Sequence, residues 1–328
     1  MPFSPSCFTL NNLIGNHSSL ISSLRSGDPR ALARAISTVE NRQPGCSDVL
    51  KALFPHTGHA RILGLTGAPG AGKSTLVDQL AKHYRKESQT VGIIAVDPTS
   101  PYTGGAILGD RIRMQDHHGD RGIFIRSMAT RGSLGGLART TADVATVLDA
   151  SGRDRILIET VGVGQDEVDI VRLADITIVI LVPGMGDDVQ TIKAGIMEIA
   201  DIFVINKSDR EGAERVEREI RAMQSLDIRK DGWTPPIVKT VASEGVGTTQ
   251  LAAAVADYEA YLKKDNLLLQ KSVENWRERL VEMLREAMLE KARAQIDAGM
   301  LDRYAAEVAA HKRDPYSLVE EVVAGVAK

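Results

Sequence analysis

Eight residues in the first quarter of the sequence have the spacing of a phosphate-binding loop. Residues 67–74 read GAPGAGKS and fit the pattern G-x-x-x-x-G-K-[S/T] in full. They follow the apolar run ILGLT and precede STLVDQLAKHY, the strand–loop–helix context that this motif requires. Backbone N–H groups of such a loop surround phosphate oxygens, and the following helix N-terminus adds its positive dipole end. We expect Lys73 to contact the β- and γ-phosphates and Ser74 to bind Mg²⁺. The predicted phosphate-binding residues are Gly70, Ala71, Gly72, Lys73, Ser74 and Thr75.

Two acidic residues end the apolar runs that follow. Asp97 ends GIIAVD, and Glu159 lies at the end of ILIET. Carboxylates at strand ends beside a phosphate loop hold a metal ion directly or through its waters. For Asp97, which precedes a proline, a helix cap or a solvated turn is the alternative.

The segment that begins at Glu159 has the pattern of a nucleotide-dependent switch. Residues 159–162 read ETVG and resemble the D-x-x-G switch of GTPases, with Glu in place of Asp. The N–H of Gly162 could bond a γ-phosphate, and the segment could move when that phosphate leaves. Gln165 is a candidate for positioning water, with an unconstrained surface side chain as the alternative.

A second motif predicts which base the nucleotide carries. Residues 206–209 read NKSD after the apolar run IFVI, and this matches the N-K-x-D motif of GTPases. The carboxylate of Asp209 can accept two hydrogen bonds from guanine, whereas adenine offers no donor at either place. Asn206 could bond the base or brace the loop, and the stem of Lys207 could lie along the ring. Ser243, after the next apolar run, could supply a backbone N–H to the guanine oxygen.

These motifs lie just after β-rich runs that alternate with helical segments. Several runs are apolar without strict alternation, which is typical of strands covered on both faces. The predicted strands are 62–66, 91–96, 123–126, 156–159, 176–182, 202–205 and 237–241. Strands that alternate with helices favour a mostly parallel sheet, whose ligands bind at the carboxyl ends of the strands. We therefore predict an α/β P-loop NTPase fold with a mostly parallel central sheet and with helical extensions at both ends.

Helical patterns flank this region on both sides. Asp28-Pro29 signals a helix start, and apolar residues follow at helical spacing: Leu32, Ala35, Ile36 and Val39. Beyond Leu251 the chain reads as helix, with an apolar stripe from Trp276 to Met288 that must pack on its own domain or on a second subunit. Gly299 is a candidate end for that helix. The predicted parts are an N-terminal helical extension (1–55), a GTPase domain (56–262) and a C-terminal helical arm (263–328), for which the family resemblance given below implies a role in dimerisation.

The overall composition argues against other classes of protein. Lys and Arg total 40 against 43 Asp and Glu, so the net charge of −3 disfavours bulk binding to nucleic acid. The two cysteines are too few for a disulfide framework or a cysteine-rich zinc site. No apolar stretch approaches the ~20 residues that span a bilayer, and no secretory signal begins the sequence. We expect a cytoplasmic protein that binds neither nucleic acid nor membrane.

Together the motifs resemble the MeaB/ArgK family of P-loop GTPases, within a group that also includes nickel and cobalt metallochaperones. The resemblance covers nearly the whole chain, and its middle stretches are more specific than the phosphate loop. The similar stretches are GLTGAPGAGKSTLVDQL, VDPTSPYTGGAILGDRIRM, ETVGVGQDEVDI, PGMGDDVQTIKAGIMEIADIFVINKSD and DPYSLVEEV.

The resemblance implies a function and roles for residues. It implies slow hydrolysis of GTP with Mg²⁺, accelerated by a partner, in a homodimeric chaperone of adenosylcobalamin-dependent methylmalonyl-CoA mutase. Such a chaperone gates loading of the cobalamin cofactor and protects the mutase from inactivation. The implied catalytic residues are Lys73, Asp97, Asp110 and Glu159, and the implied Mg²⁺ ligands are Ser74, Asp97, Asp110 and Glu159. Gly162 belongs to the second switch, and a further switch loop would signal to the mutase through Asp187, Asp188, Gln190 and Lys193.

Two other functions remain open at this point. A metallochaperone GTPase needs soft or imidazole ligands, for which His117-His118 is the candidate pair, with a solvated loop as its alternative. A small-molecule kinase needs an acceptor pocket and a base near the γ-phosphate, for which Asp110 is the best candidate.

Overall fold

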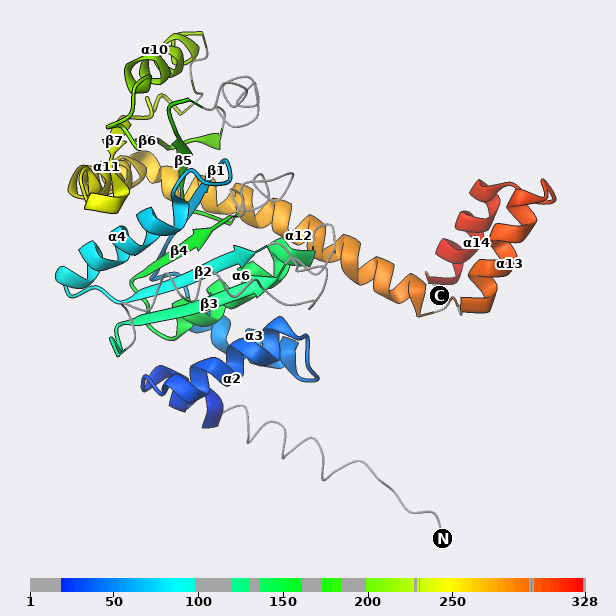
Figure 1. Cartoon of the computed structure of the whole chain (residues 1–328). Coiled ribbons are helices and arrows are strands. Elements are labelled where there is room, and N and C mark those ends of the chain that lie inside the picture. Colours follow the sequence, from blue (N-terminus) through cyan, green and yellow to red (C-terminus); the bar gives the residue numbers. More distant parts are fainter. Residues whose placement is uncertain are drawn as a thin grey trace. The chain divides into compact units, whose positions relative to one another are not determined.

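The computed structural model describes residues 19–97, 119–129, 136–160, 173–184, 199–226, 229, 231–294, 296 and 298–326. The chain divides into two compact units, one ending at Lys271 and one beginning at Ser272. The first unit contains the central sheet, and the second consists of helices (Figure 1).

In the described part of the first unit, seven strands form one sheet in the order β3-β2-β4-β1-β5-β6-β7. Every neighbouring pair is parallel. The strands are β1 (Arg61–Gly67), β2 (Val91–Asp97), β3 (Ile123–Ala129), β4 (Arg155–Glu159), β5 (Ile176–Leu181), β6 (Ile202–Asn206) and β7 (Ile237–Thr240). All seven predicted strands are present, and β3 extends three residues further than predicted. The parallel α/β fold predicted from the sequence is confirmed.

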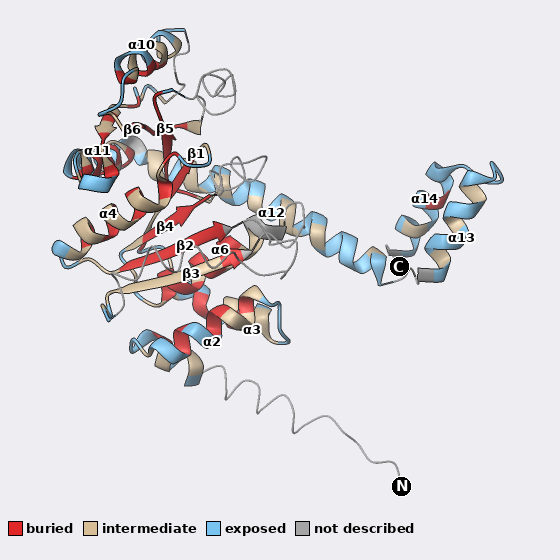
Figure 2. Cartoon of the chain, in the orientation of Figure 1, coloured by how far each residue is buried: buried red, intermediate tan, exposed pale blue. Residues whose placement is uncertain are grey.

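Helices cover both faces of the sheet because its strands are apolar on both sides. Along β2, Ile93 packs on one face with α4 (Lys73–Lys86) and α11 (Thr248–Leu262). Its neighbour Ile94 packs on the other face with α2 (Pro29–Glu40), α3 (Cys46–Leu53) and α6 (Gly136–Ala150). On the same side as Ile94, α10 (Ala213–Gln224) covers β5 and β6. Figure 2 shows the resulting layers, with buried residues along the strands and on the inner sides of these helices.

The predicted first helix is confirmed as α2. The side chain of Asp28 accepts a hydrogen bond from the backbone N–H of Arg30 at 2.9 Å, so Asp28 caps the helix and Pro29 is its first residue. The four apolar residues predicted for its inner face are all buried: Leu32, Ala35, Ile36 and Val39. The described residues of this unit also form three short 3₁₀ helices: η1 (Phe54–His56), η3 (Ala242–Glu244) and η4 (Lys264–Asn266).

A buried carboxylate ties the start of α12 (Leu267–Arg293) to the sheet. Asp201, 1% exposed, accepts hydrogen bonds from Lys271 Nζ at 2.8 Å and from the N–H of Thr177 at 2.8 Å. Its other oxygen accepts from Arg229 at 3.1 Å. Burial lowers the pKa of the Arg229 guanidinium, but the hydrogen bond with Asp231 and the charge of Asp201 outweigh it and raise the pKa overall. No motif marks this network, so it was not predicted from the sequence.

We predict that Asp201→Asn lowers the free energy of unfolding by about 2 kcal/mol, because a neutral amide leaves two cations and a backbone N–H with one acceptor oxygen. Denaturant unfolding monitored by circular dichroism measures the change. The matched control is Asp257→Asn on the exposed side of α11, which should change stability by less than about 0.5 kcal/mol. Equal effects of the two substitutions would contradict the role given to Asp201.

The second unit contains the rest of α12 together with α13 (Ala298–Ala309) and α14 (Pro315–Val326). Asp314 precedes Pro315, the first residue of α14, and accepts a hydrogen bond from the N–H of Ser317 at 2.8 Å. Gly299 was the wrong end for the long helix, since α12 ends at Arg293 and Gly299 is the second residue of α13. Among the described helices, none has a stretch that is both long and apolar enough to cross a membrane.

Candidate nucleotide-binding site

The phosphate-binding loop begins at the end of β1 and leads directly into α4. Gly67 has φ +146°, and a Cβ on it would lie 2.2 Å from the carbonyl oxygen of Ile180 on β5. Gly72 precedes the helix with φ +89°, a left-handed conformation that glycine adopts without strain. Both positions have a positive φ and a close neighbour where a Cβ would lie, so both favour glycine. The loop therefore has the strand–loop–helix geometry that the motif predicts.

Lys73 reaches back across this loop from the first turn of α4. Its side chain is 5% exposed, and Nζ donates to the carbonyl oxygens of Gly67 at 2.7 Å and Ala68 at 3.0 Å. The ammonium group thus lies within the loop whose N–H groups the motif assigns to phosphate. A positive charge held there, in a largely buried position, is suited to stabilise phosphate oxygens.

Ser74 and Glu159 meet at the carboxyl edge of the sheet. Ser74 Oγ donates to Glu159 Oε1 at 2.6 Å, and Glu159 is 6% exposed. The strand register places Glu159 opposite Leu65 of β1 and Ala95 of β2, so the acid lies beside the phosphate loop. A hydroxyl and a carboxylate oxygen side by side are the hard oxygen donors that Mg²⁺ prefers, so this pair fits a metal site. Asp97 ends β2 at the same edge of the sheet.

Asn206 connects the phosphate loop to the segment after β7. Its Nδ2 donates to the carbonyl oxygen of Ala71 at 2.8 Å. Its Oδ1 accepts from Thr240 Oγ1 at 3.0 Å and from the N–H of Ala242 at 3.1 Å. The residue is 2% exposed, so the amide acts as a buried brace, one of the two roles that the sequence left open. Thr240 and Ala242 are partners that sequence reasoning missed, because a backbone N–H and a lone threonine carry no motif.

The rest of the NKSD segment lies next to the phosphate loop. Lys207 has φ +55°, and its Nζ donates to the carbonyl oxygen of Gly70 at 2.8 Å. Backbone bonds hold the turn, from Ser208 N to Thr240 O at 3.1 Å and from Arg210 N to Lys207 O at 3.0 Å. Asp209 and Ser243 are exposed, and Ser243 lies in η3 next to Ala242. The structure thus brings the two predicted motifs together at one edge of the sheet.

Two glycines of the loop provide a matched test of the Asn206 brace. A Cβ on Gly72 would lie 2.3 Å from Nδ2 of Asn206, whereas a Cβ on Gly70 meets nothing within 4 Å. Both have positive φ, +89° and +76°, so alanine costs backbone strain of about 1 kcal/mol at either position. We predict that Gly72→Ala destabilises the protein by a further ~1–3 kcal/mol, because it displaces the amide. Thermal unfolding of both variants measures the difference, and equal losses would contradict the brace.

Several predicted residues lie outside the described part of the chain. They are Asp110, Gly162, Gln165, the pair His117-His118 and the loop residues Asp187, Asp188, Gln190 and Lys193. The backbone of Asp97 is described, but its side chain is not. Within the described ranges, no three His, Cys, Asp or Glu side chains form a group that could hold a metal ion.

Comparison with known proteins decides the family. The family model described as "Methylmalonyl Co-A mutase-associated GTPase MeaB" matches residues 32–297. The chain belongs to the MeaB family. The chain is therefore a GTPase, and the guanine preference derived from Asp209 agrees with this assignment.

The relatives of this MeaB-family chain extend the assignment. A Pyrococcus abyssi protein described as a candidate GTPase is 49% identical over 315 residues, which is 93% of this chain and 97% of the relative. The GTPase ArgK of Escherichia coli is 38% identical over 255 residues, covering 75% of this chain and 77% of that protein. The crystal structure of a protein described as a "LAO/AO transport system kinase" has a TM-score of 0.71 and 27% identity, covering 98% of this chain and all of that one. The MeaB-family chain is thus a P-loop GTPase, as its motifs predict.

Proposed function

We propose that this GTPase is a chaperone of adenosylcobalamin-dependent methylmalonyl-CoA mutase, gating cofactor loading and protecting the mutase from inactivation. The observation that carries the proposal is the match of residues 32–297 to a family described as associated with that mutase. The protein would signal its nucleotide state to the mutase by a change of conformation, because groups that contact a γ-phosphate lose that contact after hydrolysis.

The described residues suggest how GTP would be held. The N–H groups of residues 70–75 and the ammonium of Lys73 would surround the phosphates, while Asp209 and the backbone at Ser243 would read guanine. Ser74 and Glu159 would hold Mg²⁺, with Asp97 and Asp110 as the further proposed acids. A bound Mg²⁺ supplies positive charge to the phosphate oxygens. Glu159, with its carboxylate fixed by Ser74 at 2.6 Å, would connect this charge to the switch that begins beside it.

Communication with the mutase is proposed for residues outside the described ranges. Gly162 would sense the γ-phosphate, and the loop of Asp187, Asp188, Gln190 and Lys193 would signal to the mutase. The support is the resemblance of these stretches to the family. We expect turnover without the partner to be slow, because a site that only positions charge lacks a catalytic group that the partner would supply.

We also propose that the chain has three parts: an N-terminal extension (1–55), a GTPase domain (56–262) and a C-terminal arm (263–328). The arm would pair with a second copy of the chain. The support is the apolar stripe of α12, where Leu280, Leu284 and Met288 are 52%, 64% and 54% exposed. Side chains of this size gain free energy when a partner covers them. Sedimentation equilibrium of the full chain tests the dimer, and a monomer at micromolar concentration would contradict it.

The proposed function is tested by steady-state GTP hydrolysis with and without purified methylmalonyl-CoA mutase. ATP is the base-specificity control. We expect slow GTP turnover that the mutase accelerates, with ATP inert. GTP turnover that the mutase does not change, together with no binding, would contradict the chaperone role and leave the GTPase assignment intact.

A second candidate function is a small-molecule kinase, because the similar protein of known crystal structure is described as a transport system kinase. The same reactions, run with GTP labelled in the γ-phosphate, distinguish it. Transfer of label to a metabolite or protein supports the kinase, whereas label recovered only as inorganic phosphate supports the proposed switch.

A further inference from the structure

Thr160, the second residue of the proposed switch, is attached to the strand that leads into the phosphate loop. It directly follows Glu159, the last residue of β4. Its backbone N–H donates to the carbonyl oxygen of Leu65 at 3.2 Å, and its Oγ1 donates to Oγ1 of Thr66 at 3.2 Å. Leu65 and Thr66 both belong to β1, whose last residue is Gly67 of the phosphate loop. Thr160 is thus held to β1 by its backbone and by its side chain.

The two hydroxyl groups meet in a place that is closed to solvent, since Thr66 and Thr160 are each 1% exposed. The sheet does not need a paired hydroxyl for its packing. On the neighbouring strand β5, the hydroxyl of Thr177 is buried without a hydrogen-bond partner in the described structure. Replacing both members of a buried hydrogen bond by apolar groups of the same shape is nearly neutral for stability. The pair therefore contributes little to the free energy of folding and instead fixes where Thr160 lies relative to β1.

The residue before Thr160 is held to the other side of the phosphate loop. Glu159 accepts a hydrogen bond from Ser74 Oγ at 2.6 Å, and Ser74 is the second residue of α4. The start of the proposed switch is therefore connected to β1 before the loop, through Thr66, and to α4 after the loop, through Ser74. Two consecutive residues thus align this segment with the elements that position the phosphates.

We propose that the hydroxyl pair of Thr66 and Thr160 is a positioning element for GTP hydrolysis. It would hold the start of the switch at a fixed place beside the phosphate loop, so that the residues after Thr160 meet the γ-phosphate with little loss of conformational freedom. Both are positioning residues, which contact neither the nucleotide nor Mg²⁺. The inference rests on the proposed switch role of residues 159–162. GDP has no γ-phosphate, so its affinity should not depend on the pair.

The test is single-turnover hydrolysis of labelled GTP by the full chain carrying both Thr66→Val and Thr160→Val. We expect a rate constant about threefold to tenfold below that of the wild type, the effect of one neutral hydrogen bond. The Kd for GDP should change by less than about twofold, and the unfolding midpoint by less than about 2 °C. A lower midpoint or a weaker affinity for GDP would assign the pair to the fold and overturn the inference. Thr160→Ser keeps the hydroxyl and should restore hydrolysis to within about twofold of the wild-type rate.

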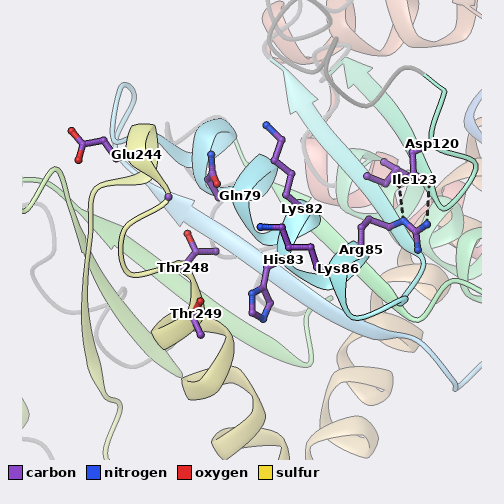
Figure 3. Close-up of a pocket in the computed structure, with 11 residues that line it drawn as sticks. Gln79, Lys82, His83, Arg85, Lys86, Asp120, Ile123, Glu244, Thr248 and Thr249 are labelled. Carbon is purple, nitrogen blue, oxygen red and sulfur yellow. Dashed lines mark hydrogen bonds and ion pairs between the residues drawn. The ribbon is translucent and has the colours of Figure 1, made fainter.

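Two other buried threonines, whose hydroxyl groups have no hydrogen-bond partner in the described structure, provide matched controls. Thr177 lies on β5, and Thr248 lies on α11 in the wall of the cavity of about 610 Å³ shown in Figure 3. Thr177→Val and Thr248→Val should each hydrolyse GTP at the wild-type rate, because neither hydroxyl is bonded to the switch. An equal loss of rate in either control would show that any buried hydroxyl has this effect, and it would overturn the inference.

Gly162→Ala distinguishes a failure of this inference from a failure of the proposed switch. If Gly162→Ala slows hydrolysis and the double valine variant does not, the switch stands and the role of the hydroxyl pair is wrong. If neither variant slows hydrolysis, the switch takes no part in the reaction, and the inference fails with it. The mutase is absent from every sample, so the chaperone role does not affect the result.

Discussion

Lys73→Met is expected to reduce GTP hydrolysis by roughly 10²–10³-fold, the usual effect of removing one charge-stabilising group from a catalytic site. The methionine keeps most of the buried stem and removes the ammonium. In the structure that ammonium lies 2.7 Å and 3.0 Å from two carbonyl oxygens of the phosphate loop. Single-turnover hydrolysis of labelled GTP, followed over hours, measures the loss.

The control for this variant is Lys51→Met, which removes an equal charge from a side chain that is 77% exposed on α3. It should hydrolyse GTP at the wild-type rate. Circular dichroism of both proteins separates loss of chemistry from loss of fold. If the Lys73→Met protein is folded and retains more than a third of wild-type turnover, Lys73 is not a catalytic residue.

Asp209→Asn is expected to weaken GTP binding by roughly 10²-fold or more and to admit xanthosine triphosphate, because the amide loses the bond from the 2-amino group and accepts from N1–H without a charge. Xanthine carries an oxygen where guanine carries its 2-amino group, so an amide that donates there suits xanthine. The fold should not change. Asp209 is exposed, and backbone bonds from Ser208 N at 3.1 Å and Arg210 N at 3.0 Å hold its turn.

Competition between the two nucleotides for a fluorescent GDP analogue measures this switch. Both Kd values should be determined for the wild type and the variant in one buffer, with ATP as the reference that neither protein prefers. Unchanged GTP affinity in a folded Asp209→Asn protein would mean that another group reads the base.

Much of the fold could be predicted because the signals are local. Strands such as Ile176–Leu181 are wholly buried, so each reads as a continuous apolar run. Asp28 and Pro29 mark a helix start through groups two residues apart. The strand order was beyond such reasoning, since it depends on which helices pack on which face. The end of α12 was missed for a related reason, because Gly299 is compatible with a helix interior at a cost of only about 1 kcal/mol.

In the candidate site, too, the local motifs could be predicted and the long-range contacts could not. The phosphate loop and the NKSD turn carry their chemistry in consecutive residues, so sequence reasoning found both and predicted that they share an edge of the sheet. The contacts that join them are long-range, such as Asn206 with Ala71 and Ser74 with Glu159. The motifs predict that these residues are functional, but they do not predict which residues the side chains bond to. The network of Asp201, Arg229 and Lys271 had no signal, because a lone aspartate at the start of a strand resembles any surface acid before its burial is known.

The Asn206 amide affects how the binding free energies of the guanosine and triphosphate parts of GTP combine. One side chain holds both Ala71 in the phosphate loop and Ala242 beside the base segment, so ordering either half fixes the other. Guanosine alone and triphosphate alone would each bear the full entropic cost of ordering both halves. GTP bears that cost once. Its binding free energy should therefore exceed the sum for the two fragments, which makes the intact nucleotide the unit that this site recognises.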